Sequence, residues 1–323
     1  HRSLESFGLK AVARHFGIAA RDRTYIEGNR ITEVYDADPE QVLRYVADDV
    51  HETRALSDLL SRGSFVQAQM LPYSYQNVCV RGNAVKIDAL MIREYLRQGH
   101  ALPRPDIQRS FAGGYTDMFA EGVVENVHHC DVRSLYPSLM LTREIGPRTD
   151  ELAIFPALLE NLRKFRLDAK RAMRECRDPD RRHHLDALQS AFKILINSFY
   201  GYLGFSQARF SDFDAAERVT AAGRKLLRSM IEWLREHGAR QIEIDTDGVY
   251  FVPPAEAGGE EGAGIDEFRR EFAEWLPAGI EIEFDGVYRS MYSYKMKNYA
   301  LLGRDGDITI KGAALKSRGL EPF

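Results

Sequence analysis

Cysteine and long apolar runs are scarce in this sequence. Its 323 residues include only three cysteines, Cys79, Cys130 and Cys176, which lie far apart and form no Cys-x-x-Cys pair. A disulfide framework and a zinc ribbon are therefore poorly supported, and small buried or half-exposed thiols are the simpler interpretation. No apolar run approaches the roughly 18 residues that a membrane helix needs, and no secretory leader pattern is recognisable. We expect a cytoplasmic protein with no membrane partner.

A large excess of charge of either sign is also lacking. The formal net charge is -4, with 44% hydrophobic and 28% charged residues, which is typical of a folded chain and argues against disorder. The length allows one large domain or two to three ordinary ones. A mildly acidic total does not favour nucleic-acid binding, but such binding needs only a local basic surface.

Hydrophobic periodicity predicts a mixture of helices and strands. Residues 1–62 are expected to be helical, residues 63–125 are mixed and rich in Gly and Pro, and 253–264 is a surface loop. The order does not alternate strand and helix regularly, so the predicted class is α+β. Helices are expected at 39–60, over 156–202 as a pair joined at Asp178-Pro179, and at 212–237 before Gly238; strands are expected at 123–132, 240–252 and 279–313.

The segment Asp131–Ser138 (DVRSLYPS) follows the first of these strands. Asp131 is expected where the strand ends, and Pro137 suits the first turn of a helix. A carboxylate there would be exposed beside the backbone N–H groups of the turn, which can bind phosphate. The simpler alternative is an ordinary strand-to-helix turn capped by Ser134.

The segment Ile244–Val249 (IDTDGV) has alternating apolar residues on both sides. This pattern predicts a tight hairpin whose turn carries Asp245 and Asp247. Taken alone, an Asp-x-Asp-Gly turn is a weak signal, because such turns are common for local reasons.

The predicted helix pair at 156–202 carries cations at helical spacing. A basic stripe is often only a solvated face, but two helices that both present cations suit a triphosphate. The stripe of the first helix contains Arg163, Arg166, Lys170, Arg174 and Arg177, and one face of the second contains Gln189, Lys193, Asn197 and Tyr200.

Together these three segments resemble motifs A, B and C of family B (α-like) DNA polymerases, in the family's order. DVRSLYPS resembles Asp-x-x-Ser-Leu-Tyr-Pro-Ser, KILINSFYG at 193–201 resembles Lys-x-x-x-Asn-Ser-x-Tyr-Gly, and DTDG resembles Asp-Thr-Asp-Ser/Gly. Weaker matches extend the resemblance: Phe111–Gly114 before motif A, Val219-Thr220 with Gly223-Arg224 before motif C, Lys297-Asn298-Tyr299, and Lys311-Gly312 with Arg318.

The chain also departs from the family's pattern at three places. Ser317-Arg318-Gly319 replaces the usual paired arginines and aspartate, which points to a divergent prokaryotic branch. Tyr45 and Asp49 resemble the third motif of the proofreading exonuclease, whereas we interpret Asp38-Pro39-Glu40 as a chance match to the first. We therefore expect no proofreading from this chain alone. The sequence stops where the family's thumb would begin, which suggests a fragment, a partly ordered protein or a reduced member.

The resemblance implies a domain order. It consists of an exonuclease-like remnant at 1–62, a first palm part at 63–155, a two-helix fingers insertion at 156–205 and a second palm part at 206–323. It further implies primer-template DNA and deoxynucleoside triphosphates as partners, and a prokaryotic, nucleoid-associated location. Its protein partners are unknown.

The implied chemistry is two-metal nucleotidyl transfer, in which the primer 3′-hydroxyl attacks the α-phosphate. Two Mg²⁺ ions, or Mn²⁺ as an alternative, would be held by Asp131 and Asp247, with Asp245 as a nearby helper. The ring of Tyr136 would exclude a 2′-hydroxyl, although it could instead be a core tyrosine. The resemblance implies nucleotide contacts for Leu135, Tyr136, Arg166, Lys170, Lys193, Asn197 and Tyr200, and DNA contacts for Gly113, Gly114, Lys297, Tyr299, Lys311 and Arg318.

Three alternatives stay open at this point. One is a catalytically reduced polymerase-like protein that binds primer-template DNA without synthesis; the intact Asp131, Asp245, Asp247 and Lys193 argue against it. A second is another palm enzyme such as a reverse transcriptase, which is disfavoured by the Asp-Thr-Asp spacing and the lysine helix. The third is a nuclease, which has only Asp49 in its favour.

Overall fold

The computed structural model describes residues 4, 6–257 and 263–312, and these fall into two compact units. Unit 1 is drawn from 1–81 and 165–192, and unit 2 from 82–164 and 193–323. Helices and one antiparallel sheet make up the described chain, which confirms the predicted α+β class. The four-part domain division stays a prediction. Within the described residues, no helix combines the length and the apolar character that crossing a bilayer requires.

Unit 1 is helical. The long helix α3 begins where the sequence predicts, because Asp38 accepts a hydrogen bond from the Gln41 amide (3.1 Å) and Pro39 occupies the first turn. The short helix α2 lies within residues 1–62, which the sequence predicts to be helical. The helices of this unit are α1 (Leu9–His15), α2 (Ile31–Ala37), α3 (Pro39–Leu60), α4 (Arg62–Met70), α5 (Tyr75–Val80) and parts of α8 (Ile154–Glu175) and α9 (Pro179–Leu203).

A buried ion pair joins α3 to the segment before α2. The Arg23 guanidinium donates to both carboxylate oxygens of Glu52, at 2.6 and 3.0 Å, and both side chains are at most 5% exposed. Arg23 also pairs with Asp49, and Tyr45 accepts a hydrogen bond from the Lys10 ammonium (2.9 Å). The two residues that resemble an exonuclease motif therefore have structural partners within unit 1. The expected lack of proofreading stays a prediction.

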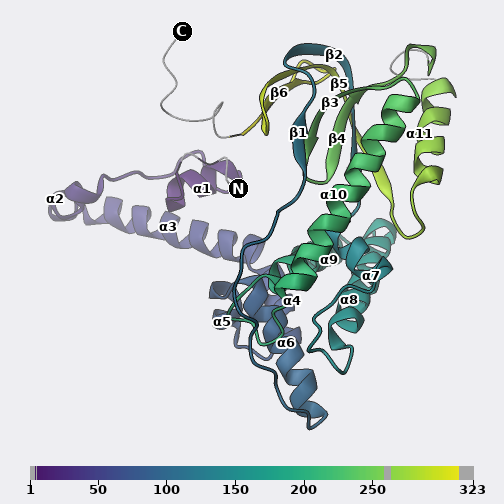
Figure 1. The fold of residues 1–323 in the computed structure, drawn as a ribbon. Coiled ribbons are helices and arrows are strands. Elements are labelled where there is room, and N and C mark those ends of the chain that lie inside the picture. The colour runs from purple at the N-terminus through teal and green to yellow at the C-terminus, as the bar shows by residue number, and fades with distance from the viewer. Residues whose placement is uncertain (1–3, 5, 258–262, 313–323) are drawn as a thin grey trace. The chain divides into compact units, whose positions relative to one another are not determined.

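Unit 2 is built on a seven-stranded antiparallel sheet in the order β1-β3-β4-β2-β5-β6-β7 (Figure 1). The strand β2 follows the prediction closely, and β3 and β4 form the predicted hairpin. The strands are β1 (Thr116–Met118), β2 (Gly122–Val132), β3 (Arg240–Asp245), β4 (Gly248–Val252), β5 (Ile282–Lys295), β6 (Asn298–Leu302) and β7 (Ile308–Lys311). The unit also contains α6 (Asn83–Arg97), α7 (Leu135–Thr142), α10 (Phe213–Glu236) and α11 (Ala263–Trp275).

The sheet has a core on each face, because alternate strand residues point to opposite sides. Val249 and Phe251 pack with buried residues of α7, α10 and α11, such as Leu139, Leu227 and Phe272. Tyr250, between them, belongs to a second buried cluster with residues of β2, β5 and β6. Figure 1 shows α10 running along the sheet, with α11 beside it.

Three local features differ from the sequence prediction or extend it. The helix α6 lies in a stretch for which only a mixed structure was predicted. Ser134 does stand at the N-terminal boundary of α7, but it has a left-handed backbone (φ 49°) and its side chain makes no capping bond there. Gly238 ends α10 as predicted, with a positive φ of 76° that suits a glycine.

The buried ion pair of unit 1 gives a stability prediction. Arg23→Met keeps the length of the side chain but leaves the Glu52 carboxylate buried without that partner, so we expect unit 1 to lose about 3 kcal/mol of stability. Arg30→Met, which removes an exposed and solvent-screened pair with Glu33, should change stability much less. Hydrogen exchange of α3 amides measures both, and equal protection in the two variants would contradict the prediction.

Candidate functional site

The first and third motifs meet at one end of the sheet in unit 2 (Figure 1). Asp131, near the end of β2, is paired with Gly248 at the start of β4. The Val132 amide donates to the Asp247 carbonyl oxygen at 2.9 Å. The antiparallel ladder therefore places Asp131 beside Asp247, although 116 positions separate them in the sequence.

The two carboxylates repel each other in a partly desolvated place. Burial and the neighbouring charge of Asp247 raise the pKa of Asp131 to about 7. Burial and the charge of Asp245 likewise raise the pKa of Asp247. The positive charge of Lys193, on α9, acts in the opposite direction and lowers the pKa of Asp131. Two raised carboxylate pKa values side by side are typical of functional sites.

These carboxylates fit a divalent cation. The buried Oδ1 of Asp131 has no hydrogen-bond partner, and a hard cation is the kind of partner that a carboxylate oxygen prefers. In the described part of the chain, no three His, Cys, Asp or Glu side chains form a ready-made metal cluster. The donor set is therefore two carboxylates with room for further oxygen ligands, as in sites where substrate phosphates complete the coordination of Mg²⁺.

The hairpin turn that carries Asp247 has a strained backbone and is held by Lys297, which lies between β5 and β6. Thr246, a β-branched residue, has a φ of 67°, which few side chains adopt. Its hydroxyl accepts a hydrogen bond from the Lys297 ammonium at 2.8 Å. The same ammonium lies 3.4 Å from Asp245 Oδ1. Lys297 thus fixes both the turn and the carboxylate before it.

Asp245 is engaged on both oxygens. Besides Lys297, it accepts a hydrogen bond from the Tyr299 hydroxyl at 3.3 Å. Tyr299 is 2% exposed and also contacts the Tyr250 hydroxyl at 3.1 Å. Both carboxylate oxygens of Asp245 therefore already have protein partners. For Tyr299 the structure shows a buried link to Asp245 rather than an open face.

Sequence reasoning missed Glu243, a fully buried carboxylate on β3. It accepts hydrogen bonds from the Lys297 amide (2.5 Å) and the Ser293 hydroxyl (3.1 Å). Burial raises its pKa. Lys297 has a φ of 61°, so Glu243 holds the tight turn between β5 and β6 that presents the lysine. The only signal in the sequence was a charged residue among apolar ones at 242–244.

Tyr136 is enclosed by close neighbours. Its ring lies 4.5 Å from the Tyr200 ring, measured between centroids, at an angle of 35°. A Cβ on Gly114 would lie 2.6 Å from the Tyr136 hydroxyl oxygen, and one on Gly223 would lie 3.1 Å from the ring. Burial raises the pKa of the hydroxyl to about 12, so it is neutral at pH 7. Glycine at 114 and 223 is what lets the ring occupy this place.

The loop that contains Gly114 is anchored on α10. The Thr220 hydroxyl donates to the Ala112 carbonyl oxygen at 2.8 Å, and the Arg224 guanidinium donates to the Ala112 and Gly113 carbonyl oxygens. The two weak sequence matches, at 111–114 and 219–224, therefore contact each other through these hydrogen bonds.

A second feature that sequence reasoning missed is a histidine beside the carboxylates. His129 Nδ1 lies 2.5 Å from Asp285 Oδ1. A Cβ on Gly248 would lie 2.4 Å from His129 Nε2, so only glycine allows the imidazole to cover the start of β4. Asp285 adds to the negative field that raises the pKa of Asp131. His129 lies two residues before Asp131, where we expected only strand.

The other predicted site residues lie in different settings. Leu135 begins α7 and is buried, whereas Lys193 and Asn197 are exposed on α9 in unit 2. Arg166 and Lys170 are half-buried in the part of α8 that belongs to unit 1. Gly113 and Lys311 are exposed, and Arg318 lies outside the described residues.

The raised pKa of Asp131 predicts how stability depends on pH. A carboxyl whose pKa is higher in the folded state contributes stability that is present below its unfolded pKa and is lost as pH rises through the folded value. With metal chelated, we expect unit 2 to lose stability between about pH 4 and pH 7, and Asp131→Asn to weaken that loss. Thermal melts in EDTA across this range test it. Parallel curves for parent and variant would contradict it.

Comparisons with known proteins agree with this geometry. The family model described as DNA polymerase family B matches residues 147–322. The chain is 28% identical to DNA polymerase 1 of Pyrococcus abyssi, over 98% of this chain and 45% of the relative. It is also 28% identical to a DNA polymerase of Archaeoglobus fulgidus, over 86% of this chain and 37% of the relative. The chain thus spans less than half the length of these relatives.

A solved structure gives the same result. The family B DNA polymerase of the hyperthermophilic archaeon Pyrobaculum calidifontis matches with a TM-score of 0.69 and 25% identity, over 96% of this chain and 44% of that one. The family model covers more than half of the 323 residues, and its matched range includes the helix of Lys193 and the hairpin of Asp247. The chain therefore belongs to DNA polymerase family B.

Proposed function

We propose that this chain carries the nucleotide-addition site of a template-directed DNA polymerase, which joins deoxynucleotides to a primer 3′-hydroxyl. The observation that carries the proposal is the pair Asp131 and Asp247, placed side by side by neighbouring strands, with the positive charge of Lys193 acting on Asp131. Two carboxylates held this close together are typical of a place that binds a cation and phosphate groups. The names of the relatives support the same substrate class.

Asp131 and Asp247 would hold the divalent ions, with Mg²⁺ as the expected metal and Mn²⁺ as an alternative. When bound, such ions polarise the phosphoryl oxygens and neutralise charge that develops during transfer. Asp245 stays in its bonds with Lys297 and Tyr299 and keeps the hairpin in place.

The cations of the helix pair would bind the triphosphate. Lys193 already lies in the field of Asp131, and it would compensate phosphate charge there. The first-turn amides of Leu135 and Tyr136 lack helical partners, as in any α-helix, so they can donate to phosphate oxygens. Arg166 and Lys170 are proposed as further triphosphate contacts.

The ring of Tyr136 would lie under the sugar, with Asn197 and Tyr200 close to the new base pair. Template pairing would select the base, so the protein needs contacts with the DNA backbone and its shape. Gly113, Gly114, Lys297, Lys311 and Arg318 are the proposed DNA contacts, whereas Tyr299, which the sequence also suggested, is buried against Asp245. The proposal includes a domain division: an exonuclease-like remnant at 1–62, a palm built from 63–155 and 206–323, and fingers at 156–205. It also includes a nucleoid-associated location.

Asp247→Asn tests the metal-binding role. The change keeps the size of the side chain but removes the charge, so primer extension should fall at least about 100-fold, since even indirect partners of a metal cost about 10–100-fold. Primer-template affinity should survive in a gel-shift assay. Asp266→Asn, at an exposed carboxylate of α11, is the matched control and should extend normally. Normal extension by Asp247→Asn would refute the role, and failure of the parent to extend any primer would favour a DNA-binding protein without synthesis.

Tyr136→Ala tests sugar selection. Because Gly114, Gly223 and Tyr200 confine the ring, it cannot move aside for a 2′-hydroxyl. A misplacement of about 1 Å can cost about 10²-fold in rate, so removing the ring should reduce discrimination against ribonucleotides by about that factor. Tyr136→Phe should discriminate like the parent. Single-nucleotide extension with paired ribo- and deoxyribonucleotides gives the ratio; unchanged discrimination in Tyr136→Ala would assign the role to another residue.

A further inference from the structure

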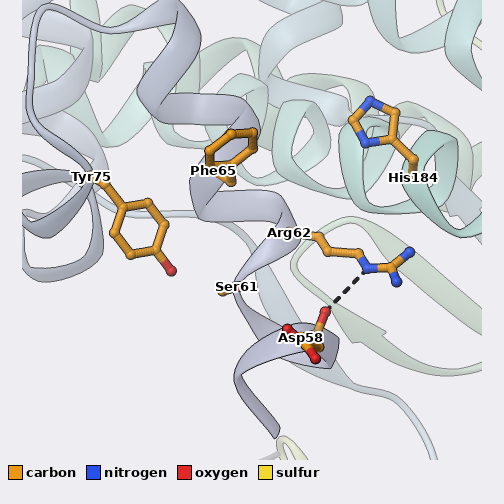
Figure 2. Close-up of a pocket in the computed structure, with 6 residues that line it drawn as sticks. All are labelled: Asp58, Ser61, Arg62, Phe65, Tyr75 and His184. Carbon is orange, nitrogen blue, oxygen red and sulfur yellow. Dashed lines mark hydrogen bonds between the residues drawn. The ribbon is translucent and has the colours of Figure 1, made fainter. Parts of the chain in front are cut away.

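Unit 1 contains a cavity that the proposed nucleotide-addition site does not use. Its volume is about 490 Å³, within the range of small-molecule pockets. Figure 2 shows the side chains around it, which come from the end of α3, from α4, from the start of α5 and from α9. The lining residues are Asp58, Ser61, Arg62, Phe65, Tyr75 and His184.

The walls of the cavity are held by helix contacts within unit 1. A Cβ on Gly63 would lie 3.8 Å from the Ala187 carbonyl oxygen and 3.9 Å from the Ala191 side chain, so α4 packs directly against α9. His184 precedes Ala187 by three residues and therefore lies on the same side of α9. Tyr75 is placed by α5, whose first turn is capped by the Ser74 hydroxyl.

Two aromatic rings in the cavity are open to solvent. Phe65 is 55% exposed and Tyr75 is 42% exposed, which is unusual for large rings on neighbouring helices. Figure 2 shows both rings on the same side of Ser61. Exposed aromatic faces of this kind are platforms on which nucleic-acid bases stack without regard to sequence.

The opposite side of the cavity is polar and carries a cation. Arg62 donates through Nε to the Asp58 carbonyl oxygen at 3.1 Å, which steadies the guanidinium (Figure 2). Among the residues that the structure describes, no carboxylate lies within ion-pair distance of Arg62. The guanidinium can therefore bind one phosphate group. The Asp58 carboxylate adds a negative charge nearby, which favours one phosphodiester over a triphosphate.

We propose that this cavity binds one unpaired nucleotide of a single-stranded DNA segment, with its base on Phe65 or Tyr75 and its phosphate at Arg62. The choice of DNA rests on the proposed polymerase function. A free nucleoside monophosphate has the same chemistry, a flat base joined to one phosphate, and the experiment separates the two sources.

The probe is a labelled single-stranded oligonucleotide of about eight nucleotides, a length within the usual site sizes. Because base stacking on an aromatic ring contributes much of the affinity for single strands, Phe65→Ala with Tyr75→Ala should weaken binding by about tenfold or more in fluorescence anisotropy. Arg62→Gln should lower the salt dependence by about one phosphate contact. The matched controls are Tyr35→Ala and Arg44→Gln, two exposed residues of unit 1 outside the cavity, and both should bind like the parent.

Cross-linking then locates the contact. An oligonucleotide with 5-bromodeoxyuridine should cross-link under ultraviolet light to peptides that contain Phe65 or Tyr75, and an unlabelled oligonucleotide should suppress the cross-link. Cross-links only elsewhere, with unchanged affinity in the double variant, would overturn the proposal. Saturable binding of thymidine monophosphate in the cavity that the oligonucleotide does not displace would overturn DNA as the source.

These measurements need no nucleotide addition, so the two proposals can fail separately. A parent chain that cross-links at Phe65 or Tyr75 but extends no primer would refute the polymerase proposal alone. A parent that extends primers but shows neither the cross-link nor the affinity loss would refute the cavity proposal alone.

Discussion

The arrangement at the end of the sheet depends on mutual repulsion among carboxylates that the fold holds together. Burial raises the pKa of both Asp131 and Asp247; the charge of Asp247 raises that of Asp131 further, and the charge of Asp245 raises that of Asp247. In a folded chain such a cluster persists only where surrounding structure determines it. Here the antiparallel ladder of β2 and β4 supplies that structure, and Lys193 and Lys297 supply positive charge.

A second constraint is the close packing around Tyr136. Gly114, Gly223 and Tyr200 lie so close to the ring that it has little room to move. Thr220 and Arg224 hydrogen-bond the loop that contains Gly114 to α10. A Cβ on Gly114 would also lie 3.3 Å from the Thr246 methyl group in the hairpin turn. A side chain at position 114 would therefore crowd both the Tyr136 ring and this turn, which lie in distant motifs of the sequence.

Much of this protein could be predicted from local patterns. Hydrophobic periodicity and turn residues predict strand β2, the β3–β4 hairpin, the helix pair and α10. These elements can be predicted because the signals for them lie within a few residues of each other in the sequence. The helix α6 was not predicted as a helix, because Gly82 at its N-terminal boundary has no side chain to cap it. The simpler alternative for this segment, a turn capped by the Ser134 hydroxyl, is not what the structure shows, because Ser134 has a left-handed backbone and makes no capping bond.

The order of the motifs is enough to single out candidate residues for the chemistry, namely Asp131, Lys193, Asp245, Asp247 and Tyr136. The side chains that surround these candidates became apparent only in the folded chain. Glu243 holds the Lys297 turn, His129 covers Gly248, and Tyr299 turns inward to Asp245 rather than outward. The physical reason is that such contacts join strands and loops far apart in the chain, so their partners depend on sheet register and burial, which no local pattern encodes.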